Sequence, residues 1–508
     1  MFAQTSRRDL LKLGAGAAAC STLTGAADLH YIKGQVRCSL THKGLPGIRI
    51  SNGRNIVRTN DQGNYAIAAS KDDIIFVVKP RNMAAALDER NLPKIHTKAG
   101  ADTYDFVLTP VREDDQFNVL LIADPQPSNP QELSYLAEIL AQTTQHETPN
   151  FVLTLGDLIG DQPQLYDAYD RLIAQLGLPI WNIPGNHDLD FTTSSPTEAR
   201  AFWRQKYGPG THAFEYGPAM FICLDNIGHG ASKGSYYDYM GHVGADNLRF
   251  VESLLRDVPK DQLIILAMHI PLISSEPKNT LACHTHDHQA LLALLEGRPC
   301  ISLSGHMHHY EHHEITTPLG TQHQHHVLNA ICGSWWTGPY DPAGQPVAQS
   351  CDGTPNGWYI LVVDGNQAHL KFQAARGSSS LRVMLGSEHG QNCTLLPQRI
   401  SCALLPQAKL FANVFSGGAH TRVSFRLAGD QPQWMSRSRA IDPSTQALFQ
   451  AAGSSRKPWA EPVVSTHLWS APLPMDLSAG QHRIDVEVFE HDHAVARTAY
   501  FLETTVGS

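Results

Sequence analysis

The sequence predicts an α/β fold with a β-rich region on each side of it. Two observations predict this class. From Phe117 onward, short apolar runs alternate with stretches of helical periodicity, which is typical of layered α/β domains. Before residue 113 and after about residue 345, strand-like runs follow one another, separated by Gly, Pro, Asn and Asp. The length of 508 residues is enough for about three domains.

Residues 1–27 have the order of an export signal. Arg7-Arg8 precedes a weakly apolar segment, Leu13–Ala19, and small residues follow. The run Ser6-Arg7-Arg8-Asp9-Leu10 resembles a twin-arginine signal, which implies a periplasmic or secreted protein. A basic amphipathic start is the alternative, and Cys20 offers a candidate site for lipoprotein anchoring. No later stretch of the sequence approaches the ~20 apolar residues that span a bilayer.

Residues 28–112 predict a β-sandwich. The strand-like runs lie at 31–38, 47–51, 64–68 and 73–78, with turn signals between them. This part of the sequence contains no cluster of potential catalytic groups. An accessory or docking domain and a spacer or stabilising cap are both open interpretations.

Residues 117–345 predict the central α/β domain. We expect strands at 119–123, 151–155, 180–183, 219–225, 263–268 and 300–303. Helices are expected at 130–143, 167–176, 245–256 and 288–295. Asp, Asn, Gln and His residues come directly after several of these strands. The carboxyl edge of the strands is where layered α/β folds bind ligands, so this edge is the predicted site.

Residues 346–508 predict a mostly β domain. We expect a hairpin formed by 357–363 and 368–372, and later strands at 421–427, 482–490 and 496–504. The boundary with the central domain is free to lie anywhere between about 342 and 380. This part has no motif that we can assign to chemistry.

The formal net charge of −9 gives no electrostatic reason to expect nucleic-acid binding. Nine cysteines are present, in no zinc-ribbon or C-x-x-C pattern. Cys393 and Cys402 are the most local candidates for a disulfide. Buried free thiols are the alternative for Cys223, Cys300 and Cys332, which lie in apolar runs.

Five short motifs in fixed order carry most of the functional information. They are Asp124-Pro125-Gln126, Gly156-Asp157, Gly185-Asn186-His187-Asp188, Met268-His269 and Gly305-His306-Met307-His308. Oxygen donors come first and imidazoles last, which is the ligand mixture of a two-metal hydrolytic site.

This ordered set resembles the calcineurin-like metallophosphoesterases, whose pattern is D-x-H, G-D, G-N-H-[DE], H, G-H-x-H. The resemblance implies an α/β/β/α sandwich and a site for two divalent metal ions. Residues 34–67 resemble a carboxypeptidase-regulatory-like β domain, and the C-terminal part resembles the domain that accompanies this phosphoesterase in some bacterial proteins.

The resemblance also implies a role for each ligand. Asp124 and His308 would hold the first metal, with Gln126 where the family pattern has His. The second metal would be held by Asn186, His269 and His306, and Asp157 would bridge the two. An amide oxygen is a harder donor than imidazole, which favours Mn²⁺ or Fe over Zn²⁺. Alternatively, Gln126 only hydrogen-bonds a metal-bound water.

In the family, the residue equivalent to His187 is not a ligand but faces the scissile phosphate and protonates the leaving group. Asp161 is the candidate to orient it, although its spacing differs from that of the serine/threonine phosphatase branch. Trp335 and Trp336 are candidates to wall a substrate pocket, together with Asn186. Burial of the two Trp at a domain interface is the alternative.

The resemblance therefore predicts an exported dinuclear-metal phosphoesterase that acts on a small or macromolecular phosphate ester. A metal-bridging hydroxide would attack phosphorus, with His187 assisting. Both phosphomonoesterase and phosphodiesterase or diphosphatase activity are open. The competing hypothesis is a non-catalytic module, derived from such an enzyme, that binds a phosphorylated ligand or a glycan.

Overall fold

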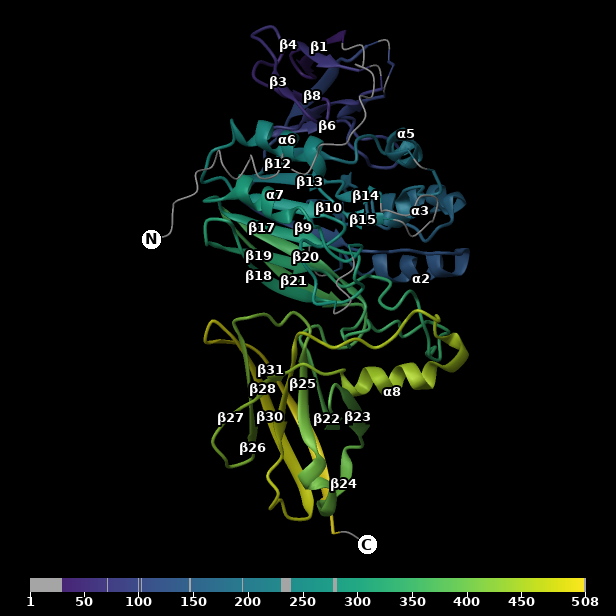
Figure 1. The fold of residues 1–508 in the computed structure, drawn as a ribbon, viewed down its shortest axis with the longest axis vertical. Coiled ribbons are helices and arrows are strands. Elements are labelled where there is room, and N and C mark those ends of the chain that lie inside the picture. Colours follow the sequence, from purple (N-terminus) through teal and green to yellow (C-terminus); the bar gives the residue numbers. More distant parts are fainter. Residues whose placement is uncertain are drawn as a thin grey trace, which may run out of the picture.

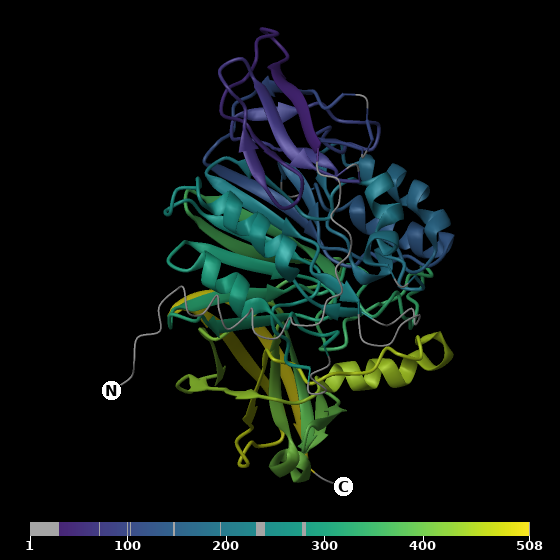
Figure 2. The same ribbon diagram turned by 45° about the horizontal axis from the view of Figure 1, so that its top comes forward.

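The computed structural model describes residues 30–506, except 71, 99, 102, 146–147, 194, 230–238 and 277–280. The predicted export signal, 1–27, lies outside the described residues. Three parts follow one another along the long axis of the molecule: an N-terminal β region, a central α/β region and a C-terminal β region (Figures 1 and 2). Among the described residues, no helix is long and apolar enough to cross a membrane.

Two sheets form the centre of the molecule. The first has the strand order β11-β10-β9-β20-β21, and the second has the order β12-β13-β16-β17-β19-β18. The first sheet comprises β9 (Gln116–Ile122), β10 (Phe151–Thr154), β11 (Ile180–Trp181), β20 (Gly357–Asp364) and β21 (Gln367–Ala374). The second comprises β12 (His212–Tyr216), β13 (Ala219–Leu224), β16 (Ile264–Met268), β17 (Cys300–Ser304), β18 (Glu311–Thr316) and β19 (Gln322–Val327). A small hairpin, β14 (Ile227–His229) and β15 (Tyr239–Gly241), lies beside them.

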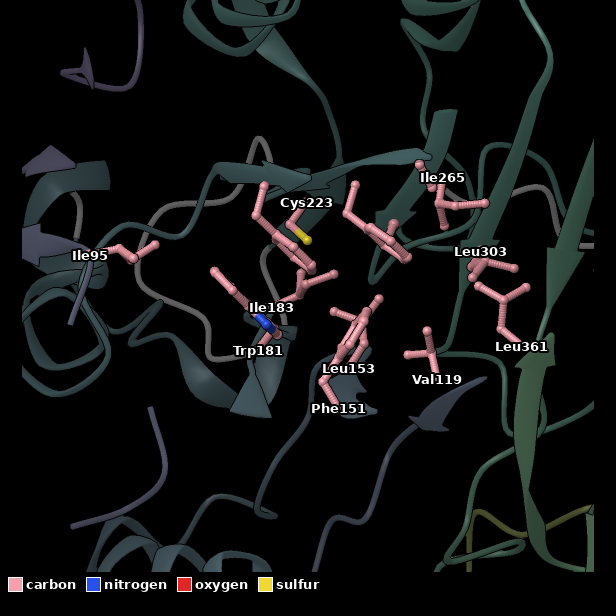
Figure 3. Packing of buried hydrophobic residues seen from close by; sticks show 14 of the residues in the cluster. Ile95, Val119, Phe151, Leu153, Trp181, Ile183, Cys223, Ile265, Leu303 and Leu361 are labelled. Carbon is pink, nitrogen blue, oxygen red and sulfur yellow. The ribbon is translucent and has the colours of Figure 1, made fainter. Parts of the chain in front are cut away.

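The strands of the first sheet are apolar on both faces because each face packs against a different layer. Val119 and Leu121 belong to the cluster between the two sheets, whereas Leu120 and Ile122 pack with the helices. Figure 3 shows side chains from both sheets in the shared core, among them Leu153, Ile265 and Leu303. Successive side chains along each strand point to opposite faces of the sheet. The order of residues therefore determines which side chains face the other sheet and which face the helices.

Helices cover the outer face of each sheet. Beside the first sheet lie α2 (Pro130–Leu140), α3 (Tyr166–Ala174), α4 (Pro196–Ala199) and α5 (Ala201–Lys206), and beside the second lie α6 (Gly244–Leu255) and α7 (His288–Leu295). The start of α2 is encoded locally, because Asn129 accepts a hydrogen bond from the Glu132 amide and Pro130 occupies the first turn. The layers are thus helix, sheet, sheet and helix, so the predicted α/β/β/α sandwich is confirmed.

The N-terminal region contains two four-stranded sheets, β4-β1-β8-β6 and β3-β2-β5-β7. Their strands are β1 (His30–Cys38), β2 (Arg49–Ser51), β3 (Ile56–Arg58), β4 (Asn64–Ala69), β5 (Ile75–Val78), β6 (Met83–Ala85), β7 (His96–Thr97) and β8 (Phe106–Pro110). A buried lysine connects this region to the central domain. Lys79 Nζ lies 2.6 Å from Glu113 Oε1 and also donates to the carbonyl of Glu215, in β12, at 2.6 Å.

The C-terminal region contains two five-stranded sheets, β23-β22-β25-β29-β28 and β24-β31-β30-β26-β27, and one helix, α8 (Pro443–Ala452). The strands are β22 (Leu381–His389), β23 (Asn392–Leu396), β24 (Arg399–Ser401), β25 (Lys409–Val414), β26 (Thr421–Leu427), β27 (Gln433–Trp434), β28 (Ser436–Ser438), β29 (Leu468–Pro472), β30 (Gly480–Glu490) and β31 (His493–Thr505). An apolar cluster that includes Leu410, Phe425 and Ile484 fills the space between the two sheets.

The C-terminal sheets begin near the late end of the range, about 342 to 380, in which the sequence places the domain boundary. The hairpin β20–β21 belongs to the central domain, because β20 pairs antiparallel with β9 through Tyr359↔Leu121 and its neighbours. The first strand of the C-terminal sheets is β22, which begins at Leu381. Each described cysteine is a free thiol, so Cys393 and Cys402 do not form the predicted disulfide.

Candidate metal centre

The loops at the carboxyl ends of the central strands bring the predicted ligands together. Asp124 follows β9, Asp157 follows β10, and Asn186 lies in the turn after β11. From the second sheet, His269 follows β16 directly, and His306 and His308 follow β17. The metal-ligating atoms of Asp157, His269 and His306 lie within 4.8 Å of one another.

The backbone at this edge is bent to bring the side chains so close. Asp124, Gln126, Asp157, His306 and His308 all have positive φ, between 41° and 76°. Non-glycine residues rarely adopt this conformation, and it is concentrated at functional sites.

Two glycines permit the close approach of the carboxylates. A Cβ on Gly185 would lie 2.1 Å from Asp157 Oδ1, and a Cβ on Gly305 would lie 2.4 Å from Asp124 Oδ2. The two glycines of the third and fifth motifs are therefore required for space around the carboxylates, beyond any role in turning the chain.

Both carboxylates are buried. Burial raises the pKa of Asp124, and the nearby Asp157 carboxylate raises it further, although His269 opposes this. At Asp157, burial is outweighed by His269 and His187, and the pKa is lowered. Two buried carboxylates at one point repel each other, so this site favours binding of positive charge.

Each ligand imidazole donates one N–H to a backbone carbonyl on its outer side. His269 Nδ1 donates to Leu155 O at 2.7 Å, His308 Nδ1 to Gly333 O at 2.8 Å, and His306 Nε2 to Ala282 O at 3.0 Å. A carbonyl oxygen only accepts, so these bonds fix the proton on the outer nitrogen. The other nitrogen of each ring therefore faces the carboxylates, which is the usual arrangement of a metal-ligating His.

The inner nitrogens and oxygens crowd together. His269 Nε2 lies 3.0 Å from Asn186 Oδ1, 3.2 Å from His306 Nδ1 and 3.3 Å from Asp157 Oδ2. Asp157 raises the pKa of His269 to about 9, although burial opposes this, and burial lowers the pKa of His306 and His308 to about 3. A single proton on His269 could satisfy only one of these acceptors, whereas a cation would satisfy all of them.

Gln126 provides an independent test of whether these side chains fit a metal ion. Its Nε2 lies 3.4 Å from Asp157 Oδ2, and its Oε1 is buried without a hydrogen-bond partner among the described residues. A buried amide oxygen without a partner is costly, so this position favours a cation or a water molecule beside the oxygen. The donor set, two carboxylates, two amide oxygens and three imidazoles, fits two divalent cations.

His187 has a different environment from the ligands. Its backbone N–H donates to Asp157 Oδ1 at 2.9 Å, and its ring Nδ1 contacts Asp161 Oδ1. Burial lowers the pKa of His187, but Asp157 and Asp161 outweigh burial, so the pKa is raised. The side chain is 18% exposed and can meet a ligand from solvent. The structure thus brings Asp161 to His187 despite its unusual spacing.

The two tryptophans take different places. Trp336 is buried, packs against Tyr135 and donates from Nε1 to Pro125 O at 3.1 Å, which holds the first motif in place. Trp335 is half-buried, and its ring stacks on His308 with 4.1 Å between centroids. Trp335 therefore lies beside the metal ligands, whereas Trp336 lies beneath them in the core.

The remaining histidines of the region serve mainly to hold the fold. Glu311 is buried between His309, whose Nε2 lies 2.7 Å from Oε1, and His313, at 2.5 Å from Oε2. His325 is fully buried and bonds Ser302 Oγ at 2.7 Å. Two aromatic residues outside the motifs approach the site. Tyr239 meets His306 edge-on at 5.8 Å between centroids, and Trp459, from the C-terminal region, meets Trp335 edge-on at 6.5 Å. The residues beside Trp459 in the sequence form no motif that would predict its place near the site. Only the contact between the central and C-terminal regions brings it there.

A two-sheet α/β/β/α sandwich with this donor set at its carboxyl edge defines a dinuclear metallohydrolase. Three models of one family match the chain in order. The N-terminal domain of calcineurin-like phosphoesterase matches residues 30–111, calcineurin-like phosphoesterase itself matches 117–310, and its C-terminal domain matches 325–494. The chain belongs to the calcineurin-like phosphoesterases. This confirms the resemblance seen in the motifs and supports a metal-dependent phosphoester hydrolase.

Three solved structures are similar to parts of this chain at low identity. A dimetal phosphatase from Danio rerio is 15% identical, covering 52% of this chain and 98% of its own, with a TM-score of 0.35. A purple acid phosphatase from yellow lupin is 12% identical, covering 65% and 67%, with a TM-score of 0.36. An NAD nucleotidase from Haemophilus influenzae is 11% identical, covering 68% and 61%, with a TM-score of 0.29. No curated protein sequence matches the chain.

Proposed function

We propose that this protein is an exported phosphoesterase that hydrolyses phosphate esters at a dinuclear metal centre. The observation that carries the proposal is the convergence of Asp157 Oδ2, Asn186 Oδ1 and His306 Nδ1 on His269 Nε2, within 3.3 Å. Groups that mainly accept hydrogen bonds approach this closely where a cation lies between them.

In this proposal, Asp124, Gln126 and His308 hold one cation and Asn186, His269 and His306 the other. Asp157 is shared, because its two oxygens face different neighbours: Oδ1 accepts from His187 N, and Oδ2 lies beside Gln126 Nε2 and His269 Nε2. When bound, two divalent cations lower the pKa of water and neutralise charge on a phosphate. The oxygen of Gln126 favours Mn²⁺ or Fe for the first cation.

His187 acts on the leaving group. Its Nδ1 is engaged by Asp161, which fixes the ring and favours the protonated form. In this proposal the opposite nitrogen, Nε2, carries the proton that is transferred to the leaving oxygen, and the imidazolium also offsets the negative charge of the phosphate. Both contacts support general acid catalysis by His187 with Asp161 as its positioning residue.

The experiment is turnover of a simple monoester, p-nitrophenyl phosphate, and a simple diester, bis(p-nitrophenyl) phosphate, by metal-loaded protein. We expect chelation to abolish hydrolysis and Mn²⁺ or Fe²⁺ to restore it better than Mg²⁺. The ratio of the two rates distinguishes a monoesterase from a diesterase. Full activity of metal-stripped protein would refute the dinuclear mechanism. Tight binding of a phosphorylated ligand without turnover of either ester would favour the alternative, a non-catalytic binding module.

A further inference from the structure

One short segment of the C-terminal region reaches back to the metal centre. It follows α8 and comprises residues 453–463, which we call the returning segment. Ser455 O accepts from Gly338 N at 3.3 Å, and the Lys457 amide donates to Thr337 Oγ1 at 3.2 Å. Lys457 Nζ also lies 2.7 Å from Glu132 Oε1, at the start of α2. These contacts fix the returning segment against the loop that contains Trp335 and Trp336.

The returning segment places Trp459 one ring away from a metal ligand. Trp335 stacks on the His308 imidazole, with 4.1 Å between centroids and 21° between planes. Trp459 meets Trp335 at 6.5 Å and 83°, an edge-to-face contact. The rings of His308, Trp335 and Trp459 are therefore in consecutive contact from the metal centre to the C-terminal region.

Packing between the two regions does not account for Trp459. The apolar contact is filled by Cys351, Phe449 and Ala460, all buried, with Trp335 packed against them. Trp459 lies outside this cluster and is 59% exposed. Trp459 is therefore an exposed aromatic ring, separated by one ring from His308, that a ligand at the site could contact.

A second exposed tryptophan of the same region provides a contrast. Trp434 is 53% exposed, but the Arg422 guanidinium lies over its ring at 3.8 Å and Phe489 packs against it at 5.5 Å. Its exposure is thus balanced by a cation–π contact within one sheet. Trp459 differs because its described aromatic contact leads toward the metal centre.

We propose that the exposed ring of Trp459, supported edge-to-face by Trp335, forms a stacking surface for a flat aromatic ring of the substrate. This rests on the proposed phosphoesterase function. The substrate class is then a phosphate ester whose alcohol portion carries an aromatic ring, such as a nucleobase or an aryl group. The C-terminal region thereby takes part in substrate recognition rather than only in stability.

The test compares a ring-bearing and a ring-free substrate. We measure kcat and KM of wild type and Trp459→Ala with adenosine 5′-monophosphate and with glycerol phosphate, in Mn²⁺. Loss of one aromatic stacking partner should lower the ratio of the two kcat/KM values about tenfold, through KM of the nucleotide. A matched substitution, Trp434→Ala, should leave this ratio at the wild-type value. An aryl phosphate in a third arm separates a nucleobase from a general aromatic preference.

An unchanged ratio in Trp459→Ala, or an equal loss for both substrates, would overturn the stacking surface. If wild type hydrolyses neither monoester, the stacking surface is tested by binding instead, and the proposed function is decided separately by turnover of bis(p-nitrophenyl) phosphate. Quenching of tryptophan fluorescence by adenosine 5′-monophosphate should then be weaker in Trp459→Ala than in Trp434→Ala. Equal quenching in the two variants would overturn it without reference to turnover.

Discussion

Asp157 contacts residues from both proposed cation sites. One oxygen accepts from His187 N, and the other lies beside Gln126 and His269. Since its negative charge faces both groups of ligands, we infer that loss of this charge weakens both cation sites together.

We therefore expect Asp157→Asn to lose at least one metal ion per chain and to lower kcat/KM by at least about a hundredfold. Elemental analysis of the purified variant and steady-state kinetics check this. Asp167→Asn is the control, because this carboxylate is 80% exposed on α3. A variant with two bound metals and normal kinetics would contradict the bridging role.

His187→Ala should behave differently. The ring lies outside the described ligand contacts and pairs with Asp161, so its loss should remove a proton donor and spare the metals. We expect kcat to fall by about 10² to 10⁴, with metal content near that of wild type. If the purified variant lacks one metal ion, His187 is a ligand, and the role proposed for it is wrong.

At the scale of the elements, buried polar contacts connect the central and C-terminal regions. Asp352, in the loop before β20, accepts from His467 Nε2 at 2.8 Å and from Tyr310 N at 3.0 Å, and both Asp352 and His467 are fully buried. Burial alone would raise the pKa of Asp352, but the hydrogen bond from His467 and its charge lower it. The contact ties the C-terminal sheets to the strand that follows the last metal motif.

We expect His467→Ala to lower the free energy of unfolding by about 3–5 kcal/mol, because it removes the imidazole partner of a buried carboxylate. His493→Ala, at an exposed position of β31, is the control. Since the pKa of Asp352 is lowered by folding, this stabilisation is present above the unfolded pKa of about 3.9 and is lost as pH falls. Denaturant unfolding should therefore show the two proteins converging below about pH 4. A constant difference across that range would contradict this account.

The sequence predicts strands well where most residues of the strand are apolar. The strands β9, β10 and β16 lie within one to three residues of the predicted bounds, because each is buried on both faces. The strands β18 and β19 were not predicted, since they carry His in place of apolar residues and are stabilised by hydrogen bonds to Ser302 and Glu311. Local patterns give no signal for such a network.

The convergence of the proposed ligands could be predicted from motif order, because these residues lie in loops that follow strands. Trp459 could not, since it is far along the chain from Trp335 and only the contact between regions brings them together. The same reason explains why the sequence left the domain boundary open between about 342 and 380, because pairing of β20 with β9 is a long-range contact.

At the scale of the whole molecule, the predicted twin-arginine export can be tested separately from the catalytic site. Twin-arginine export carries folded proteins, so the metal centre could be loaded before the protein leaves the cytoplasm. We expect Arg7→Lys together with Arg8→Lys to retain uncleaved precursor in the cytoplasm, measured by cell fractionation and by precursor size. Normal processing and export of this variant would favour secretion of an unfolded chain.

The position of β20 between β9 and β21 has a consequence for synthesis of the chain. The strands β9 and β10 leave the ribosome early, but the neighbour of β9 in the finished sheet is made much later, after the last metal motif. Until then the nascent chain displays an open, apolar strand edge, which is a site for wrong pairing. Any shortened protein intended to fold alone must therefore extend to Ala374, since one that ends at 345 would keep this edge open permanently.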